Sequence, residues 1–298
     1  MSLAAQTWDS RSFPHQEFVV QEVPVWKTIL RALVPTPLRQ AIQRRRLDRV
    51  LANYPVRQVR HKYGDSELVV ELTDPLGEGW YDHDWPTLPE IAILRSGGLR
   101  TGGVVFDLGA HHGVVALMLA REVGSTGKVI AVEALPHNAE TARRNRQLNE
   151  MSWIEVVNAG VTGVEGVLRL SHNLNATTPE ASDHGGTFEI AAVTVDSLRE
   201  QYGQPHVLFI DVEGMELEAL RGATRTLEAR PDVFVEIHTG CGLEARGGTV
   251  AEVIAFFPAE HYNCYVHTES VQIPVCLTDA PSAWLRERFF LTAVRTRR

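Results

Sequence analysis

The sequence predicts an α/β fold built on a doubly wound, mostly parallel sheet. Three observations predict it. From residue 103 onward, short continuous apolar runs alternate with segments of helical periodicity. Such runs are typical of strands that are covered by helices on both faces of a sheet. A turn with two glycines follows the first run directly, and a chain of 298 residues with 44% hydrophobic side chains can bury a large core.

The elements of this part follow in chain order. The five main strands are expected at 103–108, 129–133, 154–161, 207–211 and 233–237. The helices between them are expected at 114–122, 136–148 and 213–229. Short extra strands at 167–170 and 188–195 flank a polar loop at 172–186. After residue 248 we expect one more helix and then strands at 262–267, 271–275 and 289–294.

Residues 1–78 are expected to form an accessory region, and residues 79–298 the main domain. Residues 1–50 carry a formal charge of +4 and the remaining 248 carry −12, which indicates different roles for the two parts. A basic amphipathic helix begins near Thr36. It either packs on the main domain with its basic face in solvent, which we favour, or binds an anionic membrane or an acidic substrate. Residues 56–72 predict a β-hairpin, and 76–90 an aromatic, acidic connecting loop.

The composition excludes several classes of protein. No apolar run approaches the ~20 residues of a membrane span, and a net charge of −8 argues against general nucleic-acid binding. The N-terminus lacks the basic-then-apolar order of a secretory signal. Three cysteines, Cys241, Cys264 and Cys276, are too few and too widely spaced for a disulfide framework or a cysteine metal site. We therefore expect a cytoplasmic protein, and the sequence leaves a homo-oligomer open.

The turn after the first strand predicts a cofactor site. Asp107 precedes Gly109-Ala110-His111-His112-Gly113, and the glycines allow the backbone to turn tightly at the start of a helix. The turn lacks the middle glycine of the dinucleotide fingerprint, which makes room for a pyrophosphate. Together with the Asp107 carboxylate, this favours a cationic ligand. His112 either lines this ligand or is a surface histidine beside the turn.

Twenty residues past Gly113, Glu133 ends the second strand, where a carboxylate can accept hydrogen bonds from both hydroxyls of a ribose. S-adenosylmethionine fits a ribose here, an adenine near the end of the third strand and an amino-acid head near Asp107. In the alternative interpretation, Asp107 caps a helix and Glu133 is a surface charge. The expected cofactor-binding residues are Asp107, Gly109, Ala110, His111, Gly113, Glu133, Ala134, Asn158, Ala159 and Asp211.

The ends of the fourth and fifth strands predict a catalytic group. Asp211 ends one strand, and Glu236 and His238 end the next, where alternation points both side chains the same way. We expect His238 to be the general base, because an imidazole pKa lies near neutrality. Asp211 is the second choice, or it holds the amino group of the cofactor. The set could hold Mg²⁺, which we do not expect, and Glu216 is expected only to stabilise a helix N-terminus.

Five segments carry a resemblance to a known family. They are VVFDLGAHHG, KVIAVEALPHNAETARRNRQLN, TVDSL, FIDVEGMELEALRGA and PDVFVEIH. Through them the chain resembles the FkbM-type S-adenosylmethionine-dependent methyltransferases from about Val104 to His238. The last three segments are the most discriminating. Two departures stand out: the family usually has Asn at the position of His111 and an apolar residue at that of His112, and it usually reads EPxP where this chain has Glu133-Ala134-Leu135-Pro136.

The resemblance implies a class I methyltransferase with a Rossmann-like, seven-stranded, mostly parallel sheet. It also implies O-methylation of a sugar, a glycan or a natural-product skeleton, so that the partner is a small-molecule hydroxyl acceptor. An NAD-linked oxidoreductase and a catalytically inactive cofactor-binding or partner-binding protein are the alternatives. Segments expected to select the acceptor are the basic N-terminal helix and the loops 80–85, 172–186 and 239–248.

Overall fold

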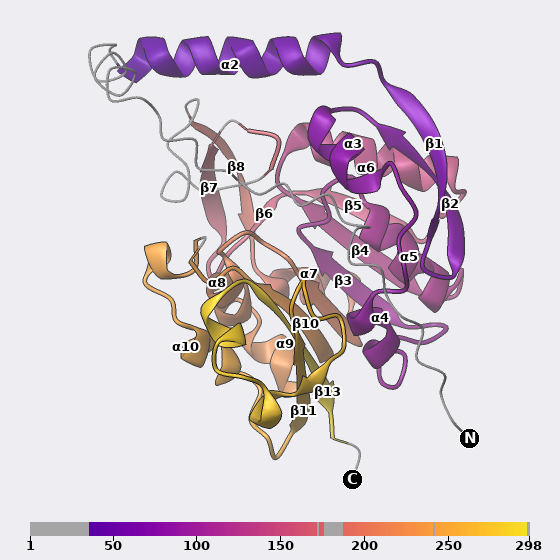
Figure 1. The fold of residues 1–298 in the computed structure, drawn as a ribbon, viewed down its shortest axis with the longest axis vertical. Coiled ribbons are helices and arrows are strands. Elements are labelled where there is room, and N and C mark those ends of the chain that lie inside the picture. The colour runs from indigo at the N-terminus through magenta and orange to yellow at the C-terminus, as the bar shows by residue number, and fades with distance from the viewer. Residues whose placement is uncertain (1–35, 172, 176–186, 241, 297–298) are drawn as a thin grey trace. The chain divides into compact units, whose positions relative to one another are not determined.

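The computed structural model describes residues 36–171, 173–175, 187–240 and 242–296 (Figure 1). The chain divides into two compact units, residues 1–39 and 40–298. The first described helix, α2 (Thr36–Asn53), begins in one unit and continues into the other. The expected functional division after residue 78 stays a prediction, and most of the loop expected at 172–186 lies outside the described residues.

An eight-stranded sheet forms the centre of the second unit (Figure 1). Its strand order is β12-β11-β13-β10-β9-β3-β4-β5. Five neighbouring strands are parallel: β5 (Ile154–Asn158), β4 (Lys128–Glu133), β3 (Val104–Leu108), β9 (Val207–Ile210) and β10 (Asp232–Ile237). Antiparallel pairing then adds β13 (Phe289–Arg295), β11 (Tyr262–His267) and the two-residue β12 (Val275–Cys276). The predicted doubly wound fold is confirmed, and the sheet has eight strands where the resemblance implies seven.

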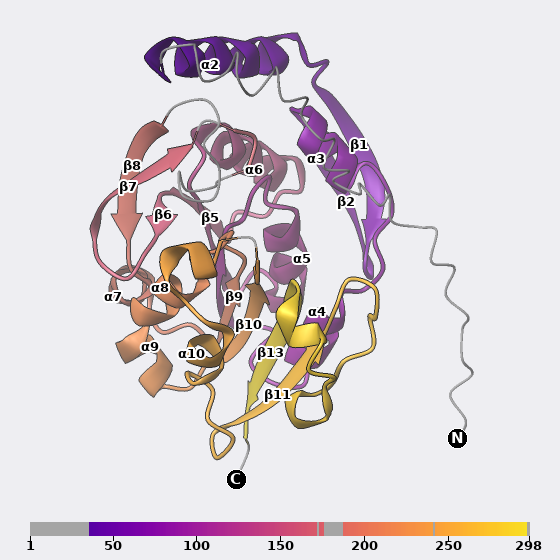
Figure 2. The same cartoon turned by 60° about the vertical axis from the view of Figure 1, so that its left-hand side comes forward.

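Helices cover both faces of this sheet (Figures 1 and 2). Alternate residues of β3 enter different cores: Val105 packs with α5 (Val114–Val123), and Phe106 packs with α7 (Val195–Tyr202) and α8 (Glu216–Arg221). The first core also takes in α4 (Pro89–Leu94) and α6 (Pro136–Leu148), and the second includes α10 (Val250–Ile254). Burial on both faces explains why the parallel strands read as continuous apolar runs.

Two predicted elements are divided in the structure. The strand expected at 154–161 is β5 followed by β6 (Gly160–Val161), which joins β8 (Thr187–Val193) and β7 (Gly166–Ser171) in a separate sheet. The helix expected at 213–229 is α8 and α9 (Thr224–Glu228). Gly214 has a φ of +90°, so a right-handed helix cannot begin before it. A hydrogen bond from the Thr226 amide to Asp196 then starts α9 separately.

Two further expectations, for residues 76–90 and 271–275, are wrong. The connecting loop expected at 76–90 contains α3 (Pro75–Tyr81) and the first residues of α4, and Asp74 caps α3 by accepting from the amides of Leu76 and Gly77. The strand expected at 271–275 is reduced to Val275 at the start of β12.

The predicted hairpin is confirmed as β1 (Arg57–Tyr63) and β2 (Ser66–Leu72). Leu68, Val70 and Leu72 lie on one face of β2, are fully buried and share a core with α5. The side chain of Asn149, just past α6, also accepts from the Val69 amide at 3.0 Å and donates to the Val69 carbonyl at 2.7 Å. The hairpin is therefore fastened to the main sheet through α5 and α6.

The expectation that α2 packs against the main domain stays a prediction, and Leu47 and Leu51 of α2 are half-buried. Ile42 and Val50 are exposed, and the arginines Arg44, Arg45, Arg46 and Arg49 are exposed as well. No helix in the described ranges has both the length and the apolar character needed to cross a membrane. The cytoplasmic location and the oligomeric state stay predictions.

We expect Leu68→Ala to lower the free energy of global unfolding by about 2–5 kcal/mol, because it leaves a cavity in the core shared with α5. Urea unfolding followed by circular dichroism measures the change. The matched control is Leu38→Ala, because the Leu38 side chain is 54% exposed and its loss should change stability by less than about 0.5 kcal/mol. An unchanged main transition with a separate early one would show that the hairpin unfolds independently.

Candidate active site

The turn between β3 and α5 is held against the end of β9. The Asp211 amide donates to the Leu108 carbonyl at 2.9 Å, and Gly109 has a φ of +94°. A Cβ on Gly109 would overlap the backbone oxygen of Asp211, so this position requires glycine. The amides of Gly109 and Ala110 also donate to the Val132 carbonyl at 2.9 and 3.0 Å. The turn thus spans the carboxyl ends of three neighbouring strands, where ligands bind in open α/β sheets.

Glu133 fixes the shape of this turn from the end of β4. It is buried, and its two carboxylate oxygens accept from the amides of His111 at 2.8 Å and Leu135 at 2.7 Å. Burial raises the pKa of Glu133 to about 7, although these amides oppose the rise. The Asn138 side chain and the Ala134 amide also donate to this carboxylate and oppose the rise. The expected contact of Glu133 with a ribose stays a prediction, to which the structure adds a positioning role.

The other expected cofactor residues lie around Glu133. The Asn158 side chain donates to the carbonyls of Glu133 at 2.8 Å and Ala134 at 3.1 Å, and the Ala159 amide donates to the Glu133 carbonyl at 3.1 Å. Gly113, with a φ of +78°, caps the N-terminus of α5. The structure therefore brings the expected cofactor set to the ends of β3, β4, β5 and β9.

Two carboxylate oxygens at these strand ends are buried without a hydrogen-bond partner among the described residues. They are Oδ2 of Asp107 and Oδ1 of Asp211. Burial raises the pKa of Asp107 to about 7, and the charge of Glu133 contributes to the rise. Burial and the charge of Glu236 raise the pKa of Asp211 well above its usual value. Buried negative charge without a partner is costly, so this edge of the sheet favours a cationic or hydrogen-bond-donating ligand.

His238 lies among four carboxylates at the end of β10. Its Nδ1 is 2.5 Å from Oε1 of Glu216. Its Nε2 is 3.4 Å from Glu236, 3.5 Å from Glu213 and 3.7 Å from Asp211. Only 2% of the His238 side chain is exposed. The predicted convergence of Asp211, Glu236 and His238 is thus observed, while their catalytic roles stay predictions.

The charges around His238 determine its protonation. Burial alone would lower the pKa of His238, but the hydrogen bond to Glu216 and the charges of Glu236, Asp211 and Glu213 raise it to about 10. The expected near-neutral pKa is therefore wrong. At neutral pH the imidazolium form predominates and acts as the counterion of the surrounding carboxylates.

Sequence reasoning missed three residues of this cluster. Glu216 is expected only to stabilise a helix N-terminus, but it is fully buried, accepts from the Gly214 amide at 2.9 Å and contacts His238. Glu213 follows Asp211 closely in sequence, and only its left-handed φ of +49° turns it toward the imidazole. Arg288 pairs with Glu236 at 3.3 Å and comes from a distant segment that carries no motif.

Aromatic side chains from α3 cover the turn after β3. The rings of Trp80 and His111 are 4.8 Å apart, and the Tyr81 hydroxyl lies 3.0 Å from Nδ1 of His111. Burial lowers the pKa of His111 well below its usual value, so this imidazole is neutral. His112 is fully buried and contacts Asp74, so the interpretation of His112 as a surface histidine is wrong.

Comparison with known proteins yields one family match. The family described as "Methyltransferase FkbM domain" matches residues 107–264 of this chain. A 2-phytyl-1,4-naphtoquinone methyltransferase of Trichormus variabilis is 34% identical over 82 residues, which cover 24% of this chain and 36% of that protein. The hexuronic acid methyltransferase AglP of Haloferax volcanii is 42% identical over 57 residues, covering 18% and 24% respectively. The chain thus matches 36% of the length of the first relative and 24% of the length of the second.

Solved structures are similar to the chain only at a distance. The FkbM methyltransferase of Methylobacillus flagellatus KT has a TM-score of 0.42 and 18% identity, with 64% of this chain and 43% of that chain covered. A SAM-dependent methyltransferase of Aquifex aeolicus has a TM-score of 0.40 and 16% identity, with coverages of 74% and 93%. Scores this low carry no argument about activity.

We expect Glu216→Gln to lower the pKa of His238, because it removes the charged acceptor of the Nδ1 hydrogen bond. An NMR titration of the imidazole resonances measures this pKa. Glu218→Gln is the matched control, since it makes the same change two residues later in α8, where Glu218 pairs with Arg221. A wild-type imidazole that loses its proton near pH 6.5 would contradict the counterion role.

Proposed function

The chain belongs to the FkbM methyltransferase family, and we propose that it transfers a methyl group from S-adenosylmethionine to a hydroxyl group of a small molecule. The observation that carries this proposal is the pair of buried carboxylate oxygens, on Asp107 and Asp211, that accept no hydrogen bond among the described residues and lie at the ends of two neighbouring parallel strands. S-adenosylmethionine carries a sulfonium and an ammonium group, and both cations suit an edge of the sheet with surplus negative charge.

The residues fit this cofactor in three respects. Gly109 lets the backbone of the turn approach closely without a side chain. The Glu133 carboxylate lies at the end of β4, where it would contact the ribose, and its position is fixed by the amides of His111 and Leu135. Asp107 offers an acceptor for the ammonium group. When bound, the cofactor supplies an electrophilic methyl group that an oxygen nucleophile can attack in line.

The cluster around His238 is the proposed acceptor side of the site. Because the pKa of His238 is about 10, removing its proton at pH 7 costs about 4 kcal/mol. A carboxylate is therefore a better general base than this imidazole. We propose Asp211 as the base that accepts the hydroxyl proton, because its Oδ1 accepts no hydrogen bond among the described residues and a raised pKa makes its ionised form more basic.

His238 and Glu236 then have supporting roles. The imidazolium keeps Asp211 and Glu236 ionised by placing a positive charge 3.4–3.7 Å from each. Arg288 holds Glu236 at 3.3 Å and contributes a second positive charge. This arrangement allows several carboxylates to share one small site without all of them taking up protons.

The class of acceptor follows from the family and from the surroundings of the turn. Trp80 is 38% exposed and presents an indole face next to His111, and such faces pack well against the apolar faces of rings. We propose a sugar, a glycan or a natural-product skeleton as the acceptor. The name of AglP, a hexuronic acid methyltransferase, supports a sugar.

We expect Asp107→Asn to weaken binding of S-adenosylmethionine by about 10- to 100-fold, because it removes a charged acceptor of nearly the same shape. The stability of the free protein should not fall, since the carboxylate has no partner to lose at Oδ2. Isothermal titration calorimetry with the cofactor and with NAD measures the affinities. Asp65→Asn is the matched control, because Asp65 is exposed and pairs with Arg95. Binding of NAD alone would overturn the proposed cofactor.

We expect Asp211→Asn to lower kcat by about 10²–10⁴-fold, the usual contribution of a general base.

We expect His238→Gln to keep a reduced activity. In its pH–rate profile the fall in rate on the acidic side should occur at higher pH than in the wild type, because Asp211 and Glu236 lose their counterion and their pKa values rise. Labelled cofactor with panels of sugars and phenols, followed by mass spectrometry, supplies the assay. An unchanged acidic limb in His238→Gln would show that the imidazolium does not control these carboxylates.

A further inference from the structure

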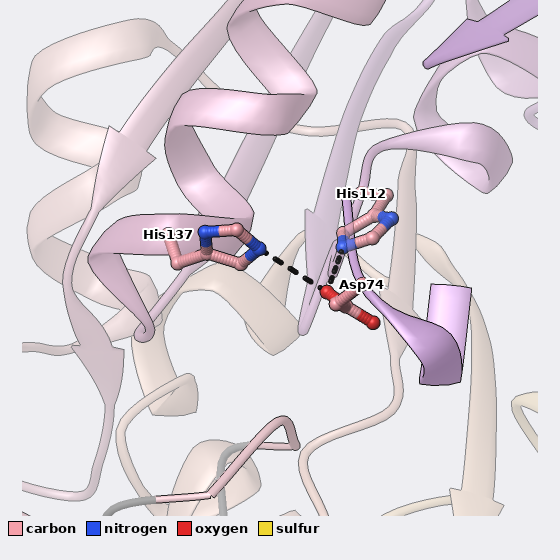
Figure 3. Close-up of side chains that lie close together, drawn as sticks. All are labelled: Asp74, His112 and His137. Carbon is pink, nitrogen blue, oxygen red and sulfur yellow. Dashed lines mark hydrogen bonds and ion pairs between the residues drawn. The ribbon is translucent and has the colours of Figure 1, made fainter. Parts of the chain in front are cut away.

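A second cluster of ionisable side chains lies outside the site described so far (Figure 3). Asp74 precedes α3, His112 is in the turn before α5, and His137 is in the first turn of α6. Both imidazoles direct Nε2 at the same oxygen, Oδ2 of Asp74, at 3.0 Å from His112 and 3.2 Å from His137 (Figure 3). The other oxygen, Oδ1, caps α3. One carboxylate oxygen thus faces two imidazole nitrogens.

A hydroxyl group completes the cluster. Oγ1 of Thr73 is 3.0 Å from Nε2 of His137 and 3.5 Å from Nε2 of His112. The Thr73 hydroxyl is held by a hydrogen bond of 3.0 Å with Oγ1 of Thr141. The Thr141 hydroxyl in turn donates to the carbonyl of His137. Two nitrogens and two oxygens from four residues therefore surround one small volume.

We propose that these four residues bind a divalent transition-metal ion of the Zn²⁺ type. Asp74, His112 and His137 would supply the ligands Oδ2, Nε2 and Nε2, and Thr73 the neutral fourth group. Tetrahedral Zn²⁺ with bonds of about 2.0–2.2 Å separates its ligand atoms by about 3.3–3.6 Å. The four separations given above lie between 3.0 and 3.5 Å. These four separations differ from those around a bound tetrahedral ion by a few tenths of an ångström.

The surroundings keep the ligands in place. Asp74 and His112 are fully buried, and Asp74 cannot turn away without losing its hydrogen bonds to the amides that begin α3. The imidazole of His112 fills the space that a Cβ on Gly77 would occupy, so α3 closes directly over the ring. His137 is 32% exposed, which leaves one side open for the ion to enter. Ligands held by such outer contacts are typical of metal sites.

The composition of the cluster selects the class of ion. Two imidazoles with one carboxylate suit Zn²⁺ and its neighbours, whereas Mg²⁺ and Ca²⁺ prefer oxygen ligands alone. The cluster of Asp211, Glu213 and His238 also brings ligand atoms together. There the imidazole faces several carboxylates and has a raised pKa, so a metal ion would have to displace a firmly held proton.

A bound ion would connect three segments that are distant in sequence. They are the end of the hairpin with α3, the turn that carries His111, and the start of α6, which follows Glu133. Binding at this site should therefore stabilise the fold around the turn after β3. The inference does not depend on the proposed methyl transfer, because metal binding can be measured without a substrate.

The test uses the full chain freed of metal with a chelator. Zn²⁺ is added in competition with a chromophoric chelator, and bound metal is counted by elemental mass spectrometry. We expect one equivalent for each chain and a rise in the thermal unfolding temperature. His137→Gln and Asp74→Asn should each weaken binding by more than about 100-fold, beyond the loss usual for outer-sphere changes. Asn at position 74 still caps α3, so this variant keeps its fold.

Two controls decide the outcome. His83→Gln removes a half-buried imidazole outside the cluster and should bind Zn²⁺ as the wild type does. Co²⁺ should give the intense visible bands of a four-coordinate site in the wild type and lose them in His137→Gln. Failure of the wild type to bind one equivalent would overturn the proposal. Unchanged affinity in Asp74→Asn and His137→Gln, or its loss in Glu213→Gln, would do the same, because the ion would then lie elsewhere.

Discussion

Concentrated negative charge at the carboxyl ends of the parallel strands is the constraint on which the site depends. Asp107 and Glu133 are buried, and Asp211 and Glu236 end the next two strands of the same edge. Parallel strands place these carboxylates side by side, and burial makes each one costly to ionise. The chain offsets this cost with backbone amides at Glu133 and an arginine at Glu236. Within the described residues, one oxygen each of Asp107 and Asp211 accepts no hydrogen bond, which makes this edge suited to a cation.

His238 shows how the same constraint changes the chemistry of a familiar residue. An isolated histidine at the end of a strand would be an obvious general base. Four neighbouring carboxylates hold its proton instead, and Glu216, fully buried beneath it, directs Nδ1. The imidazole thus serves the carboxylates as a counterion, and Asp211 is the proposed basic group in its place. His238 and Asp211 are the residues expected at the site. Local charge and burial alone make the imidazole the counterion and leave the carboxylate as the proposed base.

The two histidines in the turn after β3, which depart from the pattern of the resembled family, acquire partners from the N-terminal part of the chain. His111 contacts the Tyr81 hydroxyl, and His112 contacts Asp74. Both partners belong to the segment that continues from the hairpin into α3, and the hairpin itself is fastened to α5 and α6. The segment that contains Asp74 and Tyr81 therefore contacts both histidines of the turn after β3. These contacts connect a region without a family motif to the proposed cofactor site.

The sequence alone was enough to predict the alternation of strands and helices, the hairpin and the positions of Asp107, Glu133, Asp211, Glu236 and His238 near strand ends, because periodicity and the succession of elements along the chain are local properties. It could not determine the partners of those side chains. Glu216 reaches His238 across 22 positions, Asp74 reaches His137 across 63, and Arg288 reaches Glu236 from a distant segment. The break between α8 and α9 likewise depends on Asp196 from another helix. Only tertiary packing decides which charges meet and how deeply they are buried, and these two factors set the pKa values on which the chemistry depends.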